Sequence, residues 1–429
     1  MTKRIIAIAV VLLSLGGYAF GGGAREDRAV GEEPVRFLAS AGGSGRSFEG
    51  GMNRFNAQHG DRIRVEVETI AFGSMLDQLM TQFVAGEAFF DVMGVNSVWQ
   101  GRLLPYLEPL NSYIEERGTD VQSLYGAQMD AVTYNGNVIG LPIRVGTDVL
   151  YYRADLLEQA GLSPPGTLDE LLEAARALTT GPRDNREVYG FSYMAQEPFF
   201  TTSMTADFLF PHGIYFLDEA MEGPDPGLRT DAATRVFEVI FTLWDERLMP
   251  SPLEWTYDDN LVAMKEGRLA MTFEDYMRAP LLEADDSQVA GTMGYAVFRG
   301  EPIGPNEQRA RGGWWILSID RNSTNKRAAY EFIEFMTGFE TQEYMALEWA
   351  NGPSVVELIQ DPAFRQVNRG ADAAYTNLND LGIRDPAAVE QREQIARAIH
   401  TEVHNLFLGR KRPDQIGPDI YNAIDRILR

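Results

Sequence analysis

Short apolar stretches alternate with segments of helical spacing through the N-terminal third of the chain. VRFLAS at 35–40, RIRVEVETI at 62–70 and FDVMGV at 90–95 predict three strands, of which the third is buried. A helix that ends at Gly86 precedes the third strand, and its apolar residues recur at i, i+3, i+4 and i+7: Leu76, Leu79, Met80 and Phe83. This alternation is typical of βαβ units, in which crossover helices connect parallel strands.

The segment after the first strand, AGGSGRSFEGG at 41–51, is rich in glycine and predicts a loop. It does not have the spacing of a nucleotide-binding loop, because Phe48 stands where the third glycine of GxGxxG would be. Ser44 and Arg46 lie in this segment, and both side chains can donate hydrogen bonds to a ligand.

Helical patterns dominate much of the remaining chain. GTLDELLEAARALTTG opens with a capping box, Thr167-x-x-Glu170. Amphipathic helices are predicted over 231–248 and from Ala329 to about Gly338, and 385–429 is again helical, with a break at LGRKRPD. No repeat of fixed period is visible, so the pattern favours a mixed α/β fold over a solenoid.

A strand with two adjacent tryptophans is predicted in RARGGWWILSID at 309–320. Successive side chains on a strand point to opposite faces, so Trp315 shares one face with Leu317 and Ile319, and Trp314 lies on the other. We expect Trp315 to pack in a core and Trp314 to face a ligand, since the preceding glycines allow close approach. The alternative is that both indoles are core residues.

Composition and charge narrow the possible classes of protein. The 429 residues are too many for one compact domain, so we expect two domains. The net charge is −24, from 38 basic and 62 acidic residues, and such an acidic surface repels phosphate backbones. We therefore expect no nucleic acid partner. The sequence has no cysteine, which removes disulfides, thiolate catalysis and cysteine zinc sites.

The N-terminus has the layout of a secretory signal peptide. Lys3 and Arg4 precede an apolar run from Ile5 to Leu15, and small residues follow. The run is shorter than the roughly 20 residues that span a bilayer. We predict a signal peptide and the start of a linker over 1–24, with an uncleaved anchor as the alternative. The protein is expected to be exported, to the periplasm or the outer face of the cytoplasmic membrane.

Four segments resemble, in order, the extracellular solute-binding proteins of bacterial ABC sugar importers, a family that includes maltose-binding protein. They are VGTDVLYYRADLLEQAGLSPPGTLDELLEAARALT, AMKEGRLAMTFEDY, GGWWILSIDRNSTNKRAAYEFIEFMTGFETQ and NGPSV. The likeness extends over about Val35 to Arg429. Two departures are visible: the lipobox cysteine of many relatives is absent after the signal peptide, and Arg153 stands where the family has an asparagine.

The resemblance implies a periplasmic-binding-protein-like fold, with two α/β lobes, three crossings at a hinge and a ligand cleft between the lobes. Lobe one would comprise 35–142 and 314–350, and lobe two 146–312 and 355–429. The implied function is capture of a carbohydrate, for which we expect an oligosaccharide, and its delivery to the membrane permease of an ABC transporter. The resemblance implies a monomer that closes by hinge bending, with no catalytic residue, cofactor or metal.

A sugar presents apolar faces of C–H groups and a fringe of hydroxyl groups, so its site needs aromatic rings and planar polar side chains. In α/β sheets such groups gather at the carboxyl ends of strands. The expected ligand-binding residues are Trp314, Trp99, Asp148, Tyr276, Glu274, Trp255, Asn96, Ser44, Arg46 and Asn351. Structural roles are the alternatives; Asp148, for example, could form an ion pair with Arg144.

Three other functions stay open at this point. A secreted glycoside hydrolase would use two carboxylates from among Asp148, Glu274 and Asp275. A metal enzyme would need the histidines of HTEVH, His400 and His404, although this order is not HExxH. The same fold could also bind a peptide or a polyamine instead of a sugar.

Overall fold

The computed structural model describes residues 33–41, 43–182, 185, 187–384 and 389–429. Residues 34–429 form one compact unit, and the predicted signal peptide lies outside the described residues. Among the helices that the structure describes, none has both the length and the hydrophobicity needed to cross a membrane.

Among the described residues, eight strands belong to one sheet with the central order β2-β1-β3-β9-β6-β7. Its strands are β1 (Val35–Ser40), β2 (Val65–Ile70), β3 (Val92–Asn96), β6 (Leu141–Arg153), β7 (Met271–Asp275), β8 (Met293–Ala296), β9 (Ala310–Ile319) and β10 (Ile383–Arg384). β1 pairs with β2 and β3 in parallel, whereas β9 is antiparallel to both β3 and β6. A separate hairpin joins β4 (Thr133–Tyr134) and β5 (Asn137–Val138).

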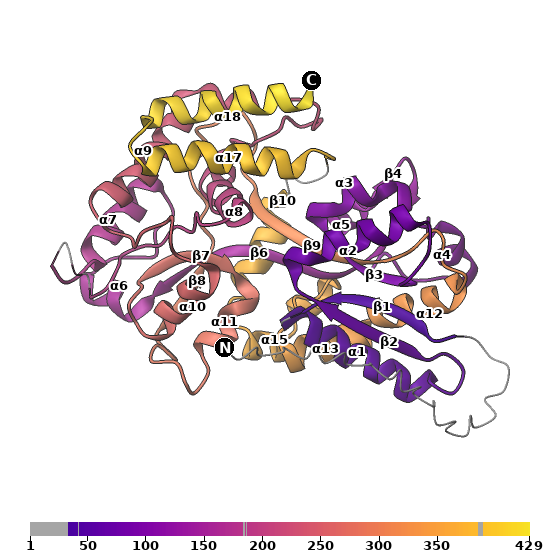
Figure 1. Cartoon of the computed structure of the whole chain (residues 1–429). Helices are drawn as coiled ribbons and strands as arrows, with labels where there is room; N and C mark the ends of the chain where they lie inside the picture. The colour runs from indigo at the N-terminus through magenta and orange to yellow at the C-terminus, as the bar shows by residue number, and fades with distance from the viewer. Residues whose placement is uncertain (1–32, 42, 183–184, 186, 385–388) are drawn as a thin grey trace, which may run out of the picture. The chain divides into compact units, whose positions relative to one another are not determined.

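The helices cover the two ends of this sheet (Figure 1). Those of the first half are α1 (Gly43–His59), α2 (Phe72–Ala85), α3 (Gln100–Leu103), α4 (Asn111–Arg117), α5 (Gly126–Ala131), α6 (Ala154–Ala160), α7 (Leu168–Leu178) and α8 (Pro198–Leu209). The others are α9 (Asp231–Asp245), α10 (Tyr257–Lys265), α11 (Ala279–Leu282), α12 (Lys326–Thr337), α13 (Phe339–Trp349), α14 (Val356–Ile359), α15 (Pro362–Val367), α16 (Ala371–Thr376), α17 (Arg392–Phe407) and α18 (Pro413–Leu428).

The mixed α/β fold with two lobes is confirmed. We call the end of the sheet with β1, β2 and β3 lobe one, and the end with β7, β8, α8 and α9 lobe two (Figure 1). β6 and β9 run through both, and the chain crosses again near Gly352, whose carbonyl accepts the N–H of Val145 at 3.0 Å. Each lobe has its own hydrophobic core. The residue boundaries predicted for the lobes stay a prediction.

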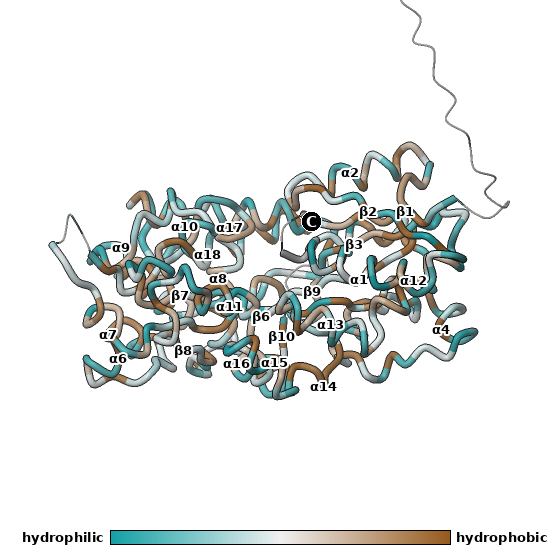
Figure 2. Tube along the Cα trace, turned by 90° about the horizontal axis from the view of Figure 1, so that it is seen from below, coloured by the Kyte–Doolittle hydropathy of each residue, from teal (hydrophilic) through white to brown (hydrophobic). Residues whose placement is uncertain are grey.

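Several predicted helices form as their patterns indicate. The capping box of Thr167 and Glu170 is present at the start of α7, and Gly86 ends α2 with a φ of 71°. Along the outer helices, hydrophobic and hydrophilic stretches alternate, as expected of helices with one buried face (Figure 2).

The glycine-rich segment after β1 is helical, so the predicted loop over 41–51 is wrong from Gly43 onward. The glycines serve close packing here. A Cβ atom on Gly45 would collide with the carbonyl oxygen of Ser40, and one on Gly50 would collide with the ring of Trp349. Tertiary contacts therefore outweigh the low helix propensity of glycine in α1.

Candidate functional site

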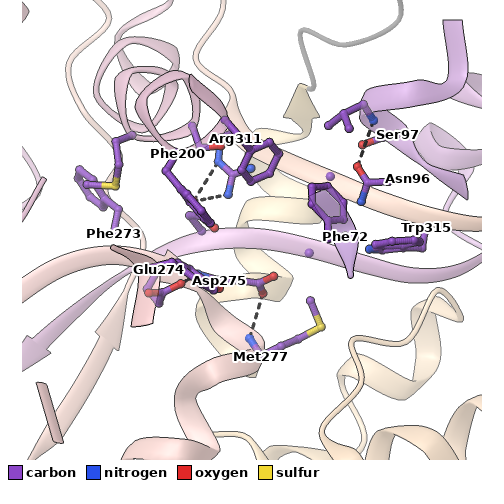
Figure 3. Close-up of a pocket in the computed structure, with 18 of the residues that line it drawn as sticks. Phe72, Asn96, Ser97, Phe200, Phe273, Glu274, Asp275, Met277, Arg311 and Trp315 are labelled. Atoms are coloured by element: carbon purple, nitrogen blue, oxygen red, sulfur yellow. Dashed lines mark hydrogen bonds and ion pairs between the residues drawn. The ribbon is translucent and has the colours of Figure 1, made fainter. Parts of the chain in front are cut away.

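A cavity of about 340 Å³ lies between the two lobes, where the ends of β1, β3 and β7 approach the centre of β6 and β9 (Figure 3). Among the described residues, its aromatic lining is Phe72, Phe199, Phe200, Tyr257, Phe273 and Trp315. Its charged lining is Arg144, Asp148, Glu274, Asp275, Arg311 and Arg392. We call this space the ligand cavity.

The two strands that pass between the lobes form the floor of the ligand cavity. Its residues alternate along both strands: Arg144, Gly146 and Asp148 on β6, and Arg311, Gly313 and Trp315 on β9. Gly146 pairs with Gly313, so no side chain rises from the centre of the floor. The charged and aromatic groups therefore surround an open stretch of backbone.

Arg311 holds two carboxylates at one end of this floor. Its Nε donates to Oδ2 of Asp148 over 2.9 Å and lies 3.3 Å from Oδ1 of Asp207, and its Nη2 also pairs with Asp148. Asp207 comes from α8 and is 5% exposed. Burial, together with the charge of Asp148, raises the pKa of Asp207 well above its usual value, and Arg311 opposes that rise.

Arg144 forms an ion pair with Asp275. The alternative considered from the sequence, an ion pair between Arg144 and Asp148, is therefore wrong. Its Nη2 lies 3.4 Å from Oδ2 of Asp275, whose Oδ1 accepts the N–H of Met277 at 3.1 Å. The described lining thus holds three carboxylates and three guanidinium groups, which balance in formal charge.

Glu274 is the most deeply buried of the three acids that line the ligand cavity. Its side chain is 4% exposed, against 9% for Asp148 and 23% for Asp275. Nη1 of Arg278 lies 3.5 Å from Oε2 of Glu274. Burial raises the pKa of Glu274 to about 7, opposed by Arg278 and reinforced by Asp148. Near neutral pH, Glu274 can therefore both donate and accept a hydrogen bond.

This raised pKa predicts a pH-dependent stability. Between the usual pKa of 4.5 and about 7, the folded protein holds the Glu274 proton more tightly than the unfolded chain, so the Glu274 contribution to stability is lost as the pH rises. Glu274→Gln, which resembles the protonated acid, should become more stable relative to wild type by about 2–3 kcal/mol between pH 4.5 and pH 8. Urea unfolding at several pH values measures this difference. If the stability of the variant and that of wild type changed with pH in parallel, the prediction would be contradicted. Glu307→Gln serves as the control, because the side chain of Glu307 is 78% exposed.

Aromatic rings are braced on both sides of the ligand cavity. In lobe one, Phe72 stacks on Trp99 with centroids 4.8 Å apart and meets Trp315 edge to face at 5.9 Å. In lobe two, Phe200 stacks on Tyr257 at 4.7 Å. Figure 3 shows Phe72 and Trp315 on one side of the cavity and Phe200 on the other. Rings held by other rings present fixed flat surfaces to a ligand.

The orientation that we predicted for the two adjacent indoles is reversed. Trp315 lines the ligand cavity, whereas Trp314 lies on the other face of β9, where its Nε1 donates to Oε1 of Gln100 over 3.3 Å. Both are largely buried, at 7% and 8% exposure. The sheet is covered on both faces at this point, so the hydrophobicity of the neighbouring residues could not indicate which face borders the cavity.

Three of the polar residues expected to bind the ligand line the cavity together: Asp148, Glu274 and Asn96. Asn96 ends β3, and its Oδ1 accepts the N–H of Val98 at 3.1 Å. This placement agrees with the rule that ligand contacts gather at the carboxyl ends of strands. Direct contact of these residues with a ligand stays a prediction.

Two expected aromatic residues do not line the ligand cavity. Tyr276 is fully buried in a hydrophobic core, and its hydroxyl lies 3.4 Å from the carbonyl oxygen of Val145, to which it donates. Trp255 packs edge to face against Tyr189, with centroids 6.1 Å apart. Both side chains therefore have the structural role that was the alternative to ligand binding. Large aromatic rings are most often buried in the core of their own lobe.

The remaining candidates are also placed away from the ligand cavity, or not described. Trp99 is buried behind Phe72 and borders a neighbouring cavity. Asn351 is buried, and its Nδ2 donates to the carbonyl oxygen of Ile143 at 3.4 Å. Arg46 is exposed on α1 and is not among the lining residues. The side chain of Ser44 lies outside the described residues.

Several lining residues were missed by the sequence analysis. Arg311 and Trp315 carry a signal that could have found them, since both alternate with Gly313 along one strand face. Phe72, Phe199 and Phe200 carry no such signal. They lie at the starts of helices, where an aromatic residue is equally typical of a packing contact.

The two histidines of HTEVH pack α17 against neighbouring segments. Nδ1 of His400 lies 2.8 Å from Oγ1 of Thr201, and Nε2 of His404 lies 2.6 Å from the carbonyl oxygen of Ala195. Across the described part of the chain, no group of three or more His, Asp or Glu side chains is arranged to hold a metal ion.

The comparison with known families agrees with this architecture. The family described as bacterial extracellular solute-binding protein matches residues 39–343. The chain belongs to this family of binding proteins. A putative binding protein of Brucella abortus is 25% identical over 402 residues, which cover 90% of each chain.

Solved structures of similar fold are likewise two-lobed binding proteins. The maltose-bound MalE3 of T. maritima has a TM-score of 0.79 and 22% identity, and the match covers 91% of this chain and 98% of that one. An ABC transporter solute-binding protein of Agrobacterium radiobacter in complex with ribitol also has a TM-score of 0.79, with 18% identity and coverage of 93% and 100%. At these identities the likeness establishes the fold.

Proposed function

We propose that this protein captures a neutral sugar or polyol outside the cytoplasmic membrane and delivers it to the permease of an ABC transporter. The observation that carries the proposal is the lining of the ligand cavity, where braced aromatic rings lie beside three carboxylates and three guanidinium groups. Rings match the C–H faces of a sugar, and planar charged groups match its hydroxyls. The maltose and ribitol bound by proteins of the same fold support this ligand class.

The ion pairs of the ligand cavity favour a neutral ligand over the polyamine or peptide considered from the sequence. Arg311 and Arg144 are already paired with Asp148 and Asp275, so a cation or anion would have to break an existing ion pair. A hydroxyl group needs no such exchange, because a paired carboxylate still has lone pairs to accept from it.

The size of the ligand cavity favours a shorter ligand than the oligosaccharide predicted from the sequence. Its volume of about 340 Å³ is at the lower end of the range for small-molecule sites. A monosaccharide, a disaccharide or a linear polyol fits this size. Contacts from both lobes would stabilise the closed form, and the closed form is the one handed to the permease.

A thermal-shift screen of neutral sugars and polyols, followed by calorimetry on each hit, tests the proposal. At a ligand concentration of 100 Kd, a bound sugar should stabilise the protein by about 2.7 kcal/mol and raise Tm by several degrees. The sugar should be recovered chemically unchanged. Stabilisation by spermidine or a tripeptide alone would contradict the ligand class, and hydrolysis of the bound sugar would favour the glycoside hydrolase.

A further inference from the structure

A second cavity lies directly behind one side of the ligand cavity. It measures about 360 Å³ and shares four lining residues with the ligand cavity: Phe72, Val98, Phe199 and Arg392. These four residues are the wall between two chambers of nearly equal size. We call the space behind the wall the rear chamber.

The wall contains an aromatic contact between the lobes. Phe72 starts α2 in lobe one and Phe199 lies in the first turn of α8 in lobe two, with ring centroids 5.7 Å apart and planes inclined by 62°. Each ring has a second aromatic neighbour: Trp99 stacks on Phe72 at 4.8 Å, and Phe200 meets Phe199 at 5.1 Å. Rings supported in this way resist displacement by a ligand.

The rear chamber repeats the chemistry of the ligand cavity. Trp99 contributes an aromatic surface, and among the described residues the charged side chains that line it are Asp77, Glu393, Arg392 and Arg397. These two acids and two guanidinium groups again balance in formal charge. This combination suits another neutral sugar unit and does not suit an apolar extension of the ligand.

We infer that the contact between Phe72 and Phe199 sets the maximum length of the ligand by closing the ligand cavity against a rear chamber that could hold further sugar units. The inference rests on the proposed function. A ligand that fills the ligand cavity ends against the two rings, and a longer chain cannot reach the rear chamber without displacing them. Shortening either ring should join the two chambers.

The test measures binding of matched sugar series to wild type, Phe199→Ala and the milder Phe72→Leu. The series are glucose, xylose and arabinose, each with its linear di- and trisaccharide, and calorimetry gives the Kd values. Wild type should bind the mono- or disaccharide of a series at least tenfold more tightly than the trisaccharide. Phe199→Ala should reduce or reverse this preference by at least tenfold. Phe273→Leu is the matched control, because Phe273 lines the ligand cavity but not the rear chamber, and its ring contacts are with Phe191, Phe208 and Phe298. It should weaken the binding of all lengths alike.

Three outcomes would overturn the inference, and they are distinguishable. If wild type binds short and long members equally, the wall does not limit length. If Phe199→Ala and Phe72→Leu weaken every length by the same factor, the ring contact only holds the lobes together. If no member of any series binds wild type or any variant while all remain folded by thermal unfolding, the inference about sugar length fails, and the screen of sugars and polyols decides the proposed function separately.

Discussion

Replacing Arg311 with methionine is expected to lower the free energy of unfolding by about 3–5 kcal/mol. The guanidinium group of Arg311 is the shared partner of Asp148 and Asp207, both nearly fully buried. Without it, two carboxylates would lie close together in a site of low polarity, and at least one would have to take up a proton. The loss should therefore be greater at pH 8 than at pH 5.

Denaturant unfolding of two further variants tests the cause of this loss. Arg327→Met removes a guanidinium that is 81% exposed and paired with Glu116, so it should cost less than about 1 kcal/mol. Combining Arg311→Met with Asp207→Asn should recover part of the stability, because only the carboxylate of Asp148 is then left buried without its guanidinium partner. An Arg311→Met protein as stable as wild type would contradict the proposed role of this ion pair.

Replacing Trp315 with alanine is expected to weaken ligand binding by roughly ten- to a hundredfold, or about 1.5–3 kcal/mol. Trp315 lines the floor of the ligand cavity and is held in place by edge contacts with Phe72 and Trp99. Its removal takes away a flat surface for the ligand and leaves its neighbours free to move into the space.

Trp314→Ala is the matched comparison, because it removes the same side chain from the other face of the same strand. Both variants should be less stable than wild type by several kcal/mol, since both indoles are largely buried. Only Trp315→Ala should lose affinity when calorimetry is done at a temperature where both are folded. A larger loss of affinity for Trp314→Ala would restore the orientation predicted from the sequence.

Much of the fold could be predicted from hydrophobic spacing and helix capping. The strand at 35–40, the helix closed by Gly86 and the capping box at Thr167 form as the pattern indicates, because each depends on neighbours close in sequence. The glycine-rich helix α1 could not be predicted in this way. Its glycines are explained by Ser40 and Trp349, and the second of these is about 300 residues away.

The candidate site was predictable where strand alternation and strand ends determine position, as for Asp148 and Asn96. It was not predictable where the choice lay between two buried faces, as for the adjacent indoles, or between a cavity wall and a core, as for Tyr276. Those choices depend on how the lobes pack against one another, and no local pattern in a single sequence encodes that packing.

The pairing of β3 with β9 has a consequence for how the chain is made. Val92 lies beside Ile319, so more than half of the chain must leave the ribosome before the third strand acquires this neighbour. Until then the edge of β3 lacks its strand partner and is open to pairing with another strand, so the nascent protein stays incompletely assembled through most of its synthesis.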